Sequence, residues 1–143
     1  MLRWCQSVLL ACVCSWGLVA ECLAQQIPAG YIGTWKRDDG GTLVFEDRGG
    51  GLIVAWVTEA DGSAGLSYAL KYDGKDYPAA QPRSKGGRNT ISSILLDPSS
   101  TEYTLKTDGK VTGRGIRTVS KDGKILAIKD PDGKVRFSWT KQP

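Results

Sequence analysis

The sequence TEYTLKTDGKVTGRGIRTVSKDGKILAIKDPDGKVRFSWT, residues 101–140, decides the fold. Short turns separate its four strand-like segments, which we predict at Thr101–Thr107, Lys110–Ser120, Lys124–Lys129 and Lys134–Thr140. Asp108-Gly109 fits a two-residue type I′ turn, because both residues tolerate positive φ. Asp130-Pro131-Asp132-Gly133 fits a longer type I turn that ends with Gly133 in the left-handed region. Antiparallel strands joined by such turns are neighbours in one sheet, so the stretch predicts an up-and-down β-meander.

The rest of the chain adds further strands of the same kind. We predict them at Ile32–Arg37, Thr42–Glu46, Leu52–Thr58, Leu66–Tyr72 and Asn89–Asp97. Ala79–Arg88 is the longest stretch without a predicted element. Short antiparallel strands in this number form either an up-and-down barrel or a sandwich, and sequential hairpins favour the barrel because closure removes exposed edges. The fold class is therefore all-β, an antiparallel up-and-down meander that closes into a barrel of about 8–9 strands.

The first 24 residues have the features of a secretory signal peptide. Arg3 gives a positive start, Val8–Ala20 is mostly apolar, and cleavage is expected after Ala24. A lipid-modified Cys22 is the alternative, but Glu21 stands where such sites normally carry a small residue. We predict a signal peptide at 1–24, an unstructured N-terminal lead-in at 25–32, a barrel domain at 33–143, and a secreted or periplasmic protein.

Composition excludes many kinds of chemistry. The chain has no histidine, and its four cysteines all lie in the leader, at positions 5, 12, 14 and 22. Ser-His-Asp and Cys-His catalysis, zinc sites with nitrogen or sulfur ligands and haem ligation through His or Cys therefore lack their reagents. A carboxylate pair remains as an enzymatic option, but six of the eleven aspartates stand immediately before Gly in turns, at positions 39, 61, 73, 108, 122 and 132. We predict no enzyme, no cofactor and no metal site.

Charge and hydropathy also restrict the partners. The formal net charge is +4, with acidic and basic residues interspersed. The one basic cluster, at Arg83, Lys85 and Arg88, has no aromatic residue between its charges for base stacking, which argues against nucleic-acid binding. Beyond the leader, the longest apolar run is Leu52–Val57, too short for a membrane span.

One resemblance is specific enough to state. Gly33-Thr34-Trp35 resembles the Gly-x-Trp signature of the first strand of lipocalins and related calycin barrels, and with residues 71–78 and 118–124 it is similar to a family of small secreted bacterial lipocalin-like proteins without an established function. The match covers nearly the whole mature chain but departs after Trp35, where the family has a longer segment. The resemblance implies a lipocalin-like barrel and export, with Trp35 packed across the closed end beneath Arg136 or Arg117.

Aromatic residues are the candidates for ligand binding. The candidate set comprises Trp35, Phe45, Trp56, Tyr68, Tyr103, Phe137 and Trp139. Our leading hypothesis is an exported, non-enzymatic binding protein for a small hydrophobic or amphipathic molecule. The alternative is a protein-interaction or inhibitor module that uses loop tips such as Ala79–Arg88 on a barrel filled by its own side chains. An open apolar cavity favours the first hypothesis, and a filled core favours the second.

Overall fold

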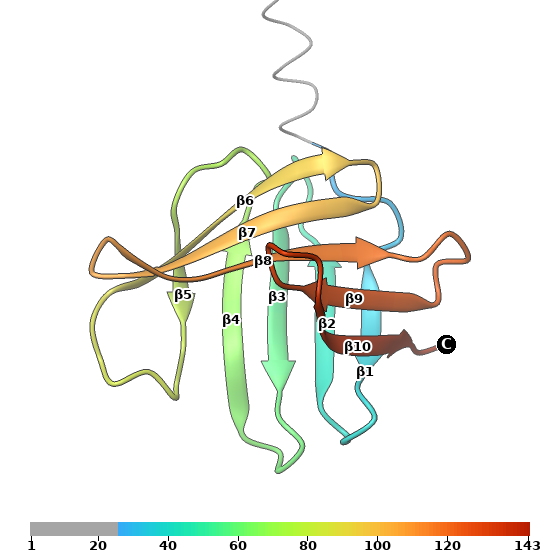
Figure 1. Ribbon diagram of the computed structural model, residues 1–143, viewed down its shortest axis with the longest axis horizontal. Coiled ribbons are helices and arrows are strands. Elements are labelled where there is room, and N and C mark those ends of the chain that lie inside the picture. The colour runs from blue at the N-terminus through green and yellow to red at the C-terminus, as the bar shows by residue number, and fades with distance from the viewer. Residues whose placement is uncertain (1–25) are drawn as a thin grey trace, which may run out of the picture.

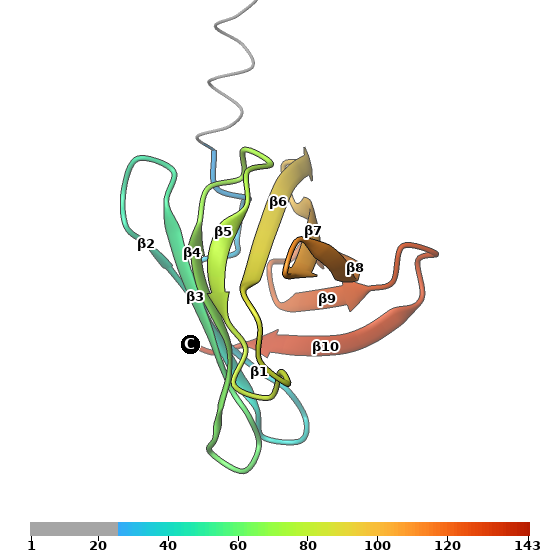
Figure 2. The ribbon, with the colours of Figure 1, turned by 90° about the vertical axis from the view of Figure 1, so that its left-hand side faces the viewer.

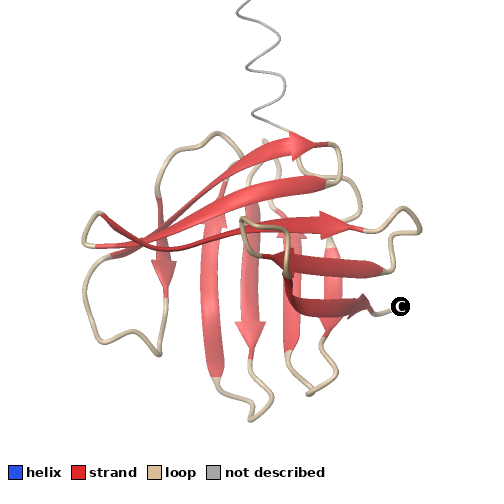
Figure 3. Ribbon diagram, viewed as in Figure 1, coloured by secondary structure: helices blue, strands red, loops and turns tan. Residues whose placement is uncertain are grey.

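The structure is a computed structural model that describes residues 26–143. Ten strands are present: β1 (Gly33–Lys36), β2 (Thr42–Asp47), β3 (Ile53–Thr58), β4 (Ala64–Leu70), β5 (Tyr77–Ala80), β6 (Asn89–Asp97), β7 (Ser100–Thr107), β8 (Lys110–Val119), β9 (Ile125–Lys129) and β10 (Val135–Lys141). Figure 3 shows only strands and loops across residues 26–143, so the predicted all-β class is confirmed. Within this part of the chain there is no helix able to cross a membrane. The predicted signal peptide lies outside the described residues.

The strands form one closed antiparallel barrel in sequence order (Figure 1). The circle closes where β1 pairs with β10, with Trp35 opposite Lys141 and Lys36 opposite Thr140. Figure 2 shows β2 to β5 as one wall and β6 to β10 as the facing wall. The meander and its closure confirm the prediction, while the strand count is ten instead of eight to nine.

The strand that the sequence did not reveal is β5. It forms only two residue pairs with each neighbour, Tyr68 with Ala79 and Ser67 with Ala80 on one side, and Tyr77 and Pro78 with β6 on the other. Pro78 lacks the N–H that a strand normally donates, so the residues around it give a weak strand signal. The short β5 and the loop 81–88 that follows it make this the least paired part of the barrel wall.

The turns of the second half have the geometry that their residues predict. Asp108 and Gly109 have φ of 51° and 79°, as the two central residues of a type I′ turn require. Gly133 has φ of 89°, and its N–H donates to the Asp130 carbonyl oxygen at 2.9 Å. These turns hold β7 with β8 and β9 with β10 as adjacent pairs.

The meander gives the barrel two ends. The turns after β2, β4, β6 and β8 lie at the end that we call the closed end, because residues 26–32 pack there: the Ala29 N–H donates to the Pro98 carbonyl oxygen at 2.7 Å. The turns after β1, β3, β5, β7 and β9 lie at the other end, which we call the mouth. The lead-in forms no strand, but its description as unstructured was wrong, since the side chain of Tyr31 is fully buried.

Inward-facing side chains from most strands fill the barrel. The buried hydrophobic residues are Tyr31, Trp35, Leu43, Phe45, Ile53, Ala55, Tyr68, Leu70, Tyr72, Ile91, Tyr103, Val119, Leu126 and Trp139. Glycine makes room for one of them: a Cβ on Gly115 of β8 would lie 2.5 Å from the Tyr103 hydroxyl oxygen. The Tyr103 ring therefore lies across the β8 backbone, where no other residue than glycine leaves space for it.

Candidate functional site

A positively charged side chain lies inside the barrel. Arg117 follows the inward alternation of β8 and is only 4% exposed. Its guanidinium carbon is 4.3 Å from the centroid of the Tyr103 ring, 5.6 Å from that of Tyr68 and 6.0 Å from that of Phe45. Tyr72 is buried beside them. We call Arg117 and these four rings the aromatic chamber. Arginine stays protonated in proteins, so the chamber contains a permanent cation.

The cation of the aromatic chamber has no counter-ion. Among the residues that the structure describes, the ion pairs involve other cations, and none includes Arg117. Its Nε and Nη1 atoms have no hydrogen-bond acceptor, and the hydroxyl groups of Tyr68 and Tyr72 have no partner. Cation–π contact with the rings offsets part of the desolvation of the charge but does not satisfy these N–H groups. Guanidinium N–H groups and phenol hydroxyls without a hydrogen-bond partner therefore share one buried space that contains no anionic acceptor.

The tyrosine hydroxyls of the chamber remain donors at neutral pH. Burial raises the pKa of Tyr68 and raises that of Tyr72 well above its ordinary value. Both phenols therefore stay protonated and neutral, because the charged phenolate is disfavoured away from water. At neutral pH, the charged group of the chamber is therefore the Arg117 guanidinium.

Two buried residues at the closed end, Tyr31 and Trp35, have their polar groups paired. The Tyr31 hydroxyl donates to the Arg117 carbonyl oxygen at 2.8 Å and lies 3.2 Å from the Thr101 hydroxyl. Desolvation raises the pKa of Tyr31 to about 12, and the hydrogen bond with Thr101 opposes part of that rise. The Trp35 indole N–H donates to the Tyr31 carbonyl oxygen at 2.9 Å. Tyr31 is thus a structural plug that ties the lead-in to β7 and β8.

The cation over the first-strand tryptophan differs from the one expected. The Lys141 ammonium lies 5.2 Å from the centroid of the Trp35 ring and donates to the Gly30 carbonyl oxygen at 2.9 Å. The expectation of Arg136 or Arg117 was wrong, because Arg117 faces the aromatic chamber and Arg136 pairs with Asp130. Trp35 and Lys141 are directly opposite in the pairing of β1 with β10, which explains why Lys141 covers the Trp35 ring.

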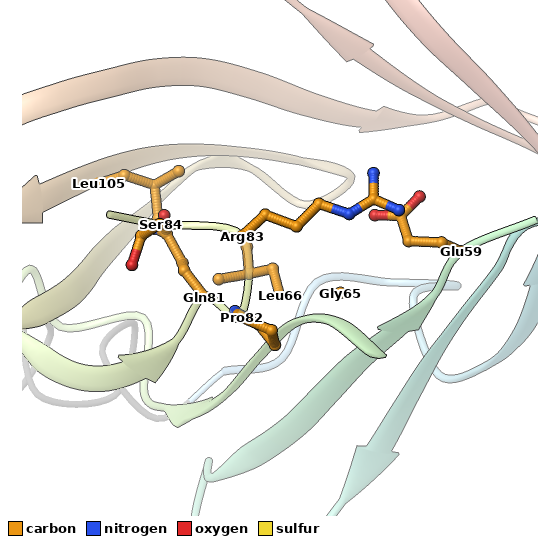
Figure 4. Close-up of a pocket in the computed structure, with 8 residues that line it drawn as sticks. All are labelled: Glu59, Gly65, Leu66, Gln81, Pro82, Arg83, Ser84 and Leu105. Carbon is orange, nitrogen blue, oxygen red and sulfur yellow. The ribbon is translucent and has the colours of Figure 1, made fainter. Parts of the chain in front are cut away.

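A pocket of about 280 Å³ opens at the mouth (Figure 4). Its lining residues are Glu59, Gly65, Leu66, Gln81, Pro82, Arg83, Ser84 and Leu105. Leu66 stands two residues from Tyr68 on β4, and Leu105 stands two residues from Tyr103 on β7, in each case on the same face and toward the mouth. One such step along a strand is about 7 Å. The pocket therefore lies one layer of side chains above the aromatic chamber.

Charged side chains surround the mouth. Figure 4 shows Arg83 extending toward Glu59 over the pocket, and Arg83 pairs with Asp61 at 3.7 Å. Glu59 is bound by Arg37 at 3.3 Å. The Arg37 guanidinium carbon also lies 4.9 Å from the ring centroid of Trp139. The mouth thus combines an apolar floor with a charged rim.

Six of the seven predicted aromatic residues fall into three groups. Phe45, Tyr68 and Tyr103 line the aromatic chamber, whereas Trp35 belongs to the closed end. Trp139 is buried below the mouth, and Phe137, on the same strand, is 45% exposed there, with Arg37 5.3 Å from its ring centroid.

Trp56 lies apart from every one of these groups. It is only partly buried and is paired with Val44 of β2 and Ser67 of β4, on the face opposite to the buried Ala55. Its side chain is therefore directed away from the interior, and the structure does not bring it to the other candidates.

Some residues that matter at the site are not marked by the sequence. Arg117 was considered only as a cover for Trp35, although it shares a face with Gly115 and Val119, which could have suggested an inward position. Tyr31 was assigned to the lead-in, and Leu66 and Leu105 had no signal that set them apart from other core positions. Only the barrel geometry brings these side chains together.

The acidic residues have the structural role expected of turn aspartates. Oδ1 of Asp61, Asp73, Asp122 and Asp132 accepts a backbone N–H from the residue two positions later. Hydrogen bonds to Ser63 hold the pKa of Asp61 below its usual value, as expected of an acceptor for backbone and hydroxyl donors. Among residues 26–143, no group of three or more His, Cys, Asp or Glu residues is placed to hold a metal ion.

Comparisons with known proteins support the fold. No protein-family model and no curated protein matches the chain. A crystal structure of a mutant of the fluorescent protein UnaG is similar to it, with a TM-score of 0.54 and 21% sequence identity, over 80% of this chain and 97% of that one. At such identity the likeness shows the fold alone, a closed antiparallel β-barrel. The bacterial family and the export route stay predictions.

Proposed function

We propose that the protein is an exported, non-enzymatic binding protein for a small amphipathic molecule that enters through the mouth of the barrel. The observation that carries the proposal is the position of the mouth pocket directly above the aromatic chamber. Leu66 and Leu105 offer apolar contacts, while Gln81 and Arg83 offer polar ones at the rim. An apolar lining with a few polar groups is the usual composition of a small-molecule site.

The arrangement of the acids supports binding without catalysis. Catalysis by carboxylates needs two acids that converge on one reacting atom. Glu59 is the acid that lines the mouth pocket, and it is held by Arg37. Asp61, Asp122 and Asp132 are engaged by their own turns. The site therefore favours recognition of a molecule over its chemical conversion.

One observation favours the second function, a protein-interaction module. The mouth pocket, at about 280 Å³, is at the lower limit of small-molecule sites, which range over about 300–1,000 Å³. Side chains fill the layers below it. A barrel of this kind would present loop 81–88 to a protein partner. We rank this function second because the loop itself forms the wall of an apolar pocket.

Binding of the neutral apolar dye phenylnaphthylamine tests the proposal. We expect saturable fluorescence enhancement with one site per chain. Leu66→Trp fills the mouth pocket and should weaken dye binding by about tenfold or more, the equivalent of about 1.4 kcal/mol. Ile94→Trp is the matched control, because Ile94 is 43% exposed away from the pocket, and it should leave dye binding unchanged. If neither this dye nor a panel of fatty acids and alcohols binds, the carrier function is wrong and a protein partner should be sought.

A further inference from the structure

We infer that the ligand carries a carboxylate group, which binds to the Arg117 guanidinium inside the aromatic chamber. The inference rests on the proposed function and deepens it, because it names the chemical class of the ligand and the side chain that selects it. Nε and Nη1 of Arg117 and the hydroxyls of Tyr68 and Tyr72 can all donate a hydrogen bond, and none of these atoms has a hydrogen-bond partner. An anion is the group that satisfies such donors, and its charge would neutralise the buried cation.

The charges of the chamber favour a single negative charge. Its titratable groups other than Arg117 are tyrosines, and burial keeps the hydroxyls of Tyr68 and Tyr72 neutral. A phosphate or another dianion would bring a second negative charge without a compensating cation, which is costly away from water. A carboxylate has one charge, and its planar oxygens suit the parallel N–H groups of a guanidinium.

The path from the mouth to Arg117 is short. Tyr103 and Tyr68, which lie between the mouth pocket and the guanidinium, retain exposed fractions of 9% and 6%. Tyr103 lies over Gly115, so its ring has no side chain of β8 beneath it and can turn without displacing one. A carboxylate that passes these two rings leaves its apolar tail between Leu66 and Leu105. The expected ligand is therefore a short or medium-length organic monocarboxylate.

A matched pair of ligands separates the head group from the tail. Octanoate and octanol share an apolar chain and differ in charge, so their affinities are compared by isothermal titration calorimetry with the purified protein at neutral pH. A hydrogen bond to a charged group contributes about 1.5–3 kcal/mol. We therefore expect octanoate to bind about ten- to a hundredfold more tightly than octanol.

Three variants test whether the preference for octanoate depends on Arg117. Arg117→Met should remove the preference for octanoate while octanol binds as before. The variant is expected to fold, because a buried unpaired charge is replaced by an apolar side chain of similar length. Arg114→Met removes a charge from the same strand at an exposed position, so the preference should persist. Arg117→Lys keeps the charge and should retain part of the preference.

The outcomes distinguish the two proposals. Equal affinity of the wild type for octanoate and octanol would overturn the carboxylate inference and leave the carrier function intact. Arg117 would then be a structural cation held by its contacts with the rings. If Arg117→Met still bound octanoate more tightly than octanol, the inference would also be overturned. If octanoate, octanol and the neutral dye all fail to bind, the carrier function itself is overturned. The wild-type comparison needs no variant, so it decides the question even if Arg117→Met does not fold.

Discussion

The closed end and the aromatic chamber differ in how their polar groups are satisfied. At the closed end, the buried Tyr31 hydroxyl and Trp35 indole and the partly exposed Lys141 ammonium each donate to a backbone carbonyl oxygen. In the adjoining aromatic chamber, Arg117 and Tyr68 have polar atoms without a hydrogen-bond partner, and the Trp139 indole N–H below the mouth is also unpaired. Both regions are buried and rich in aromatic residues, so neither burial nor composition accounts for the difference.

The difference indicates that one region stabilises the fold and the other binds a ligand. Buried donors are normally paired, and an unpaired one lowers stability by about 1–3 kcal/mol. The Tyr31, Trp35 and Lys141 donors at the closed end are all paired, as expected of a region whose role is to stabilise the fold. The polar groups of the aromatic chamber are unpaired and lie beneath a pocket, as expected of a region that binds a ligand. The predictions below test this contrast through stability.

The largest expected effect is the loss of Trp35. Trp35 is fully buried and its N–H is hydrogen-bonded, so Trp35→Ala creates a cavity and leaves the Tyr31 carbonyl oxygen without its donor. The free energy of unfolding, measured by urea denaturation, should fall by about 3–5 kcal/mol. Trp56→Ala is the control: its side chain lies on the outer face, and its loss should have a much smaller effect. Equal effects would mean that the closed end is not the stabilising region.

The next effect concerns alkaline pH. Burial raises the pKa of Tyr31 from its ordinary value of 10.0 to about 12. Between these two values the folded protein keeps a proton that the unfolded chain has released. The stability that Tyr31 contributes is therefore complete below pH 10 and is lost as pH rises toward 12. The loss for this one group is about 2–3 kcal/mol.

Urea denaturation at several alkaline pH values measures this loss. Tyr31→Phe lacks the titrating hydroxyl, so its stability should fall less steeply over the same range. Parallel pH profiles for the two proteins would show that Tyr31 titrates normally and is not the plug that the structure describes.

A smaller effect is expected at Gly115. A methyl group there would lie 2.5 Å from the Tyr103 hydroxyl oxygen, so Gly115→Ala forces the ring away from Arg117. Overpacking of this kind lowers stability by about 1–3 kcal/mol. Gly113→Ala is a matched control two residues away, where the new methyl group would lie 3.6 Å from Leu105, an ordinary contact. Tyr103→Leu combined with Gly115→Ala should recover part of the lost stability, and no recovery would exclude this ring as the cause.

The order of the strands could be predicted because it depends on local turn chemistry. Asp108-Gly109 and the turn around Gly133 adopt the positive φ values that their residues permit, and each such turn makes neighbours of two successive strands. The fifth strand was missed for the same local reason, since Pro78 gives a signal against a strand. Its position in the sheet comes from pairing with β4 and β6, which are assembled only in the barrel.

The candidate site could be predicted only in part because alternation shows two faces without showing which of them is inside. Leu52–Val57 is apolar on both faces, so nothing in it marks Trp56 as outward. Phe137 shares a face with the buried Trp139, but an irregular register between Val135 and Phe137 and its place at the mouth leave it exposed. An inward Arg117 contradicts the usual preference of charges for the surface.

The finest test of the contrast between the closed end and the aromatic chamber removes one oxygen atom from each. Tyr31→Phe deletes a hydroxyl bound to the Arg117 carbonyl oxygen, and should lower the free energy of unfolding by about 1–2 kcal/mol. Tyr68→Phe deletes a buried hydroxyl without a partner, so stability should stay the same or rise slightly. Urea denaturation of both variants measures the two changes, and octanoate titration of Tyr68→Phe should show weaker binding because a donor to the carboxylate is lost. If Tyr68→Phe lost as much stability as Tyr31→Phe, the Tyr68 hydroxyl would be hydrogen-bonded in the unliganded protein. The proposed difference between the closed end, with paired donors, and the aromatic chamber, with unpaired ones, would then be wrong.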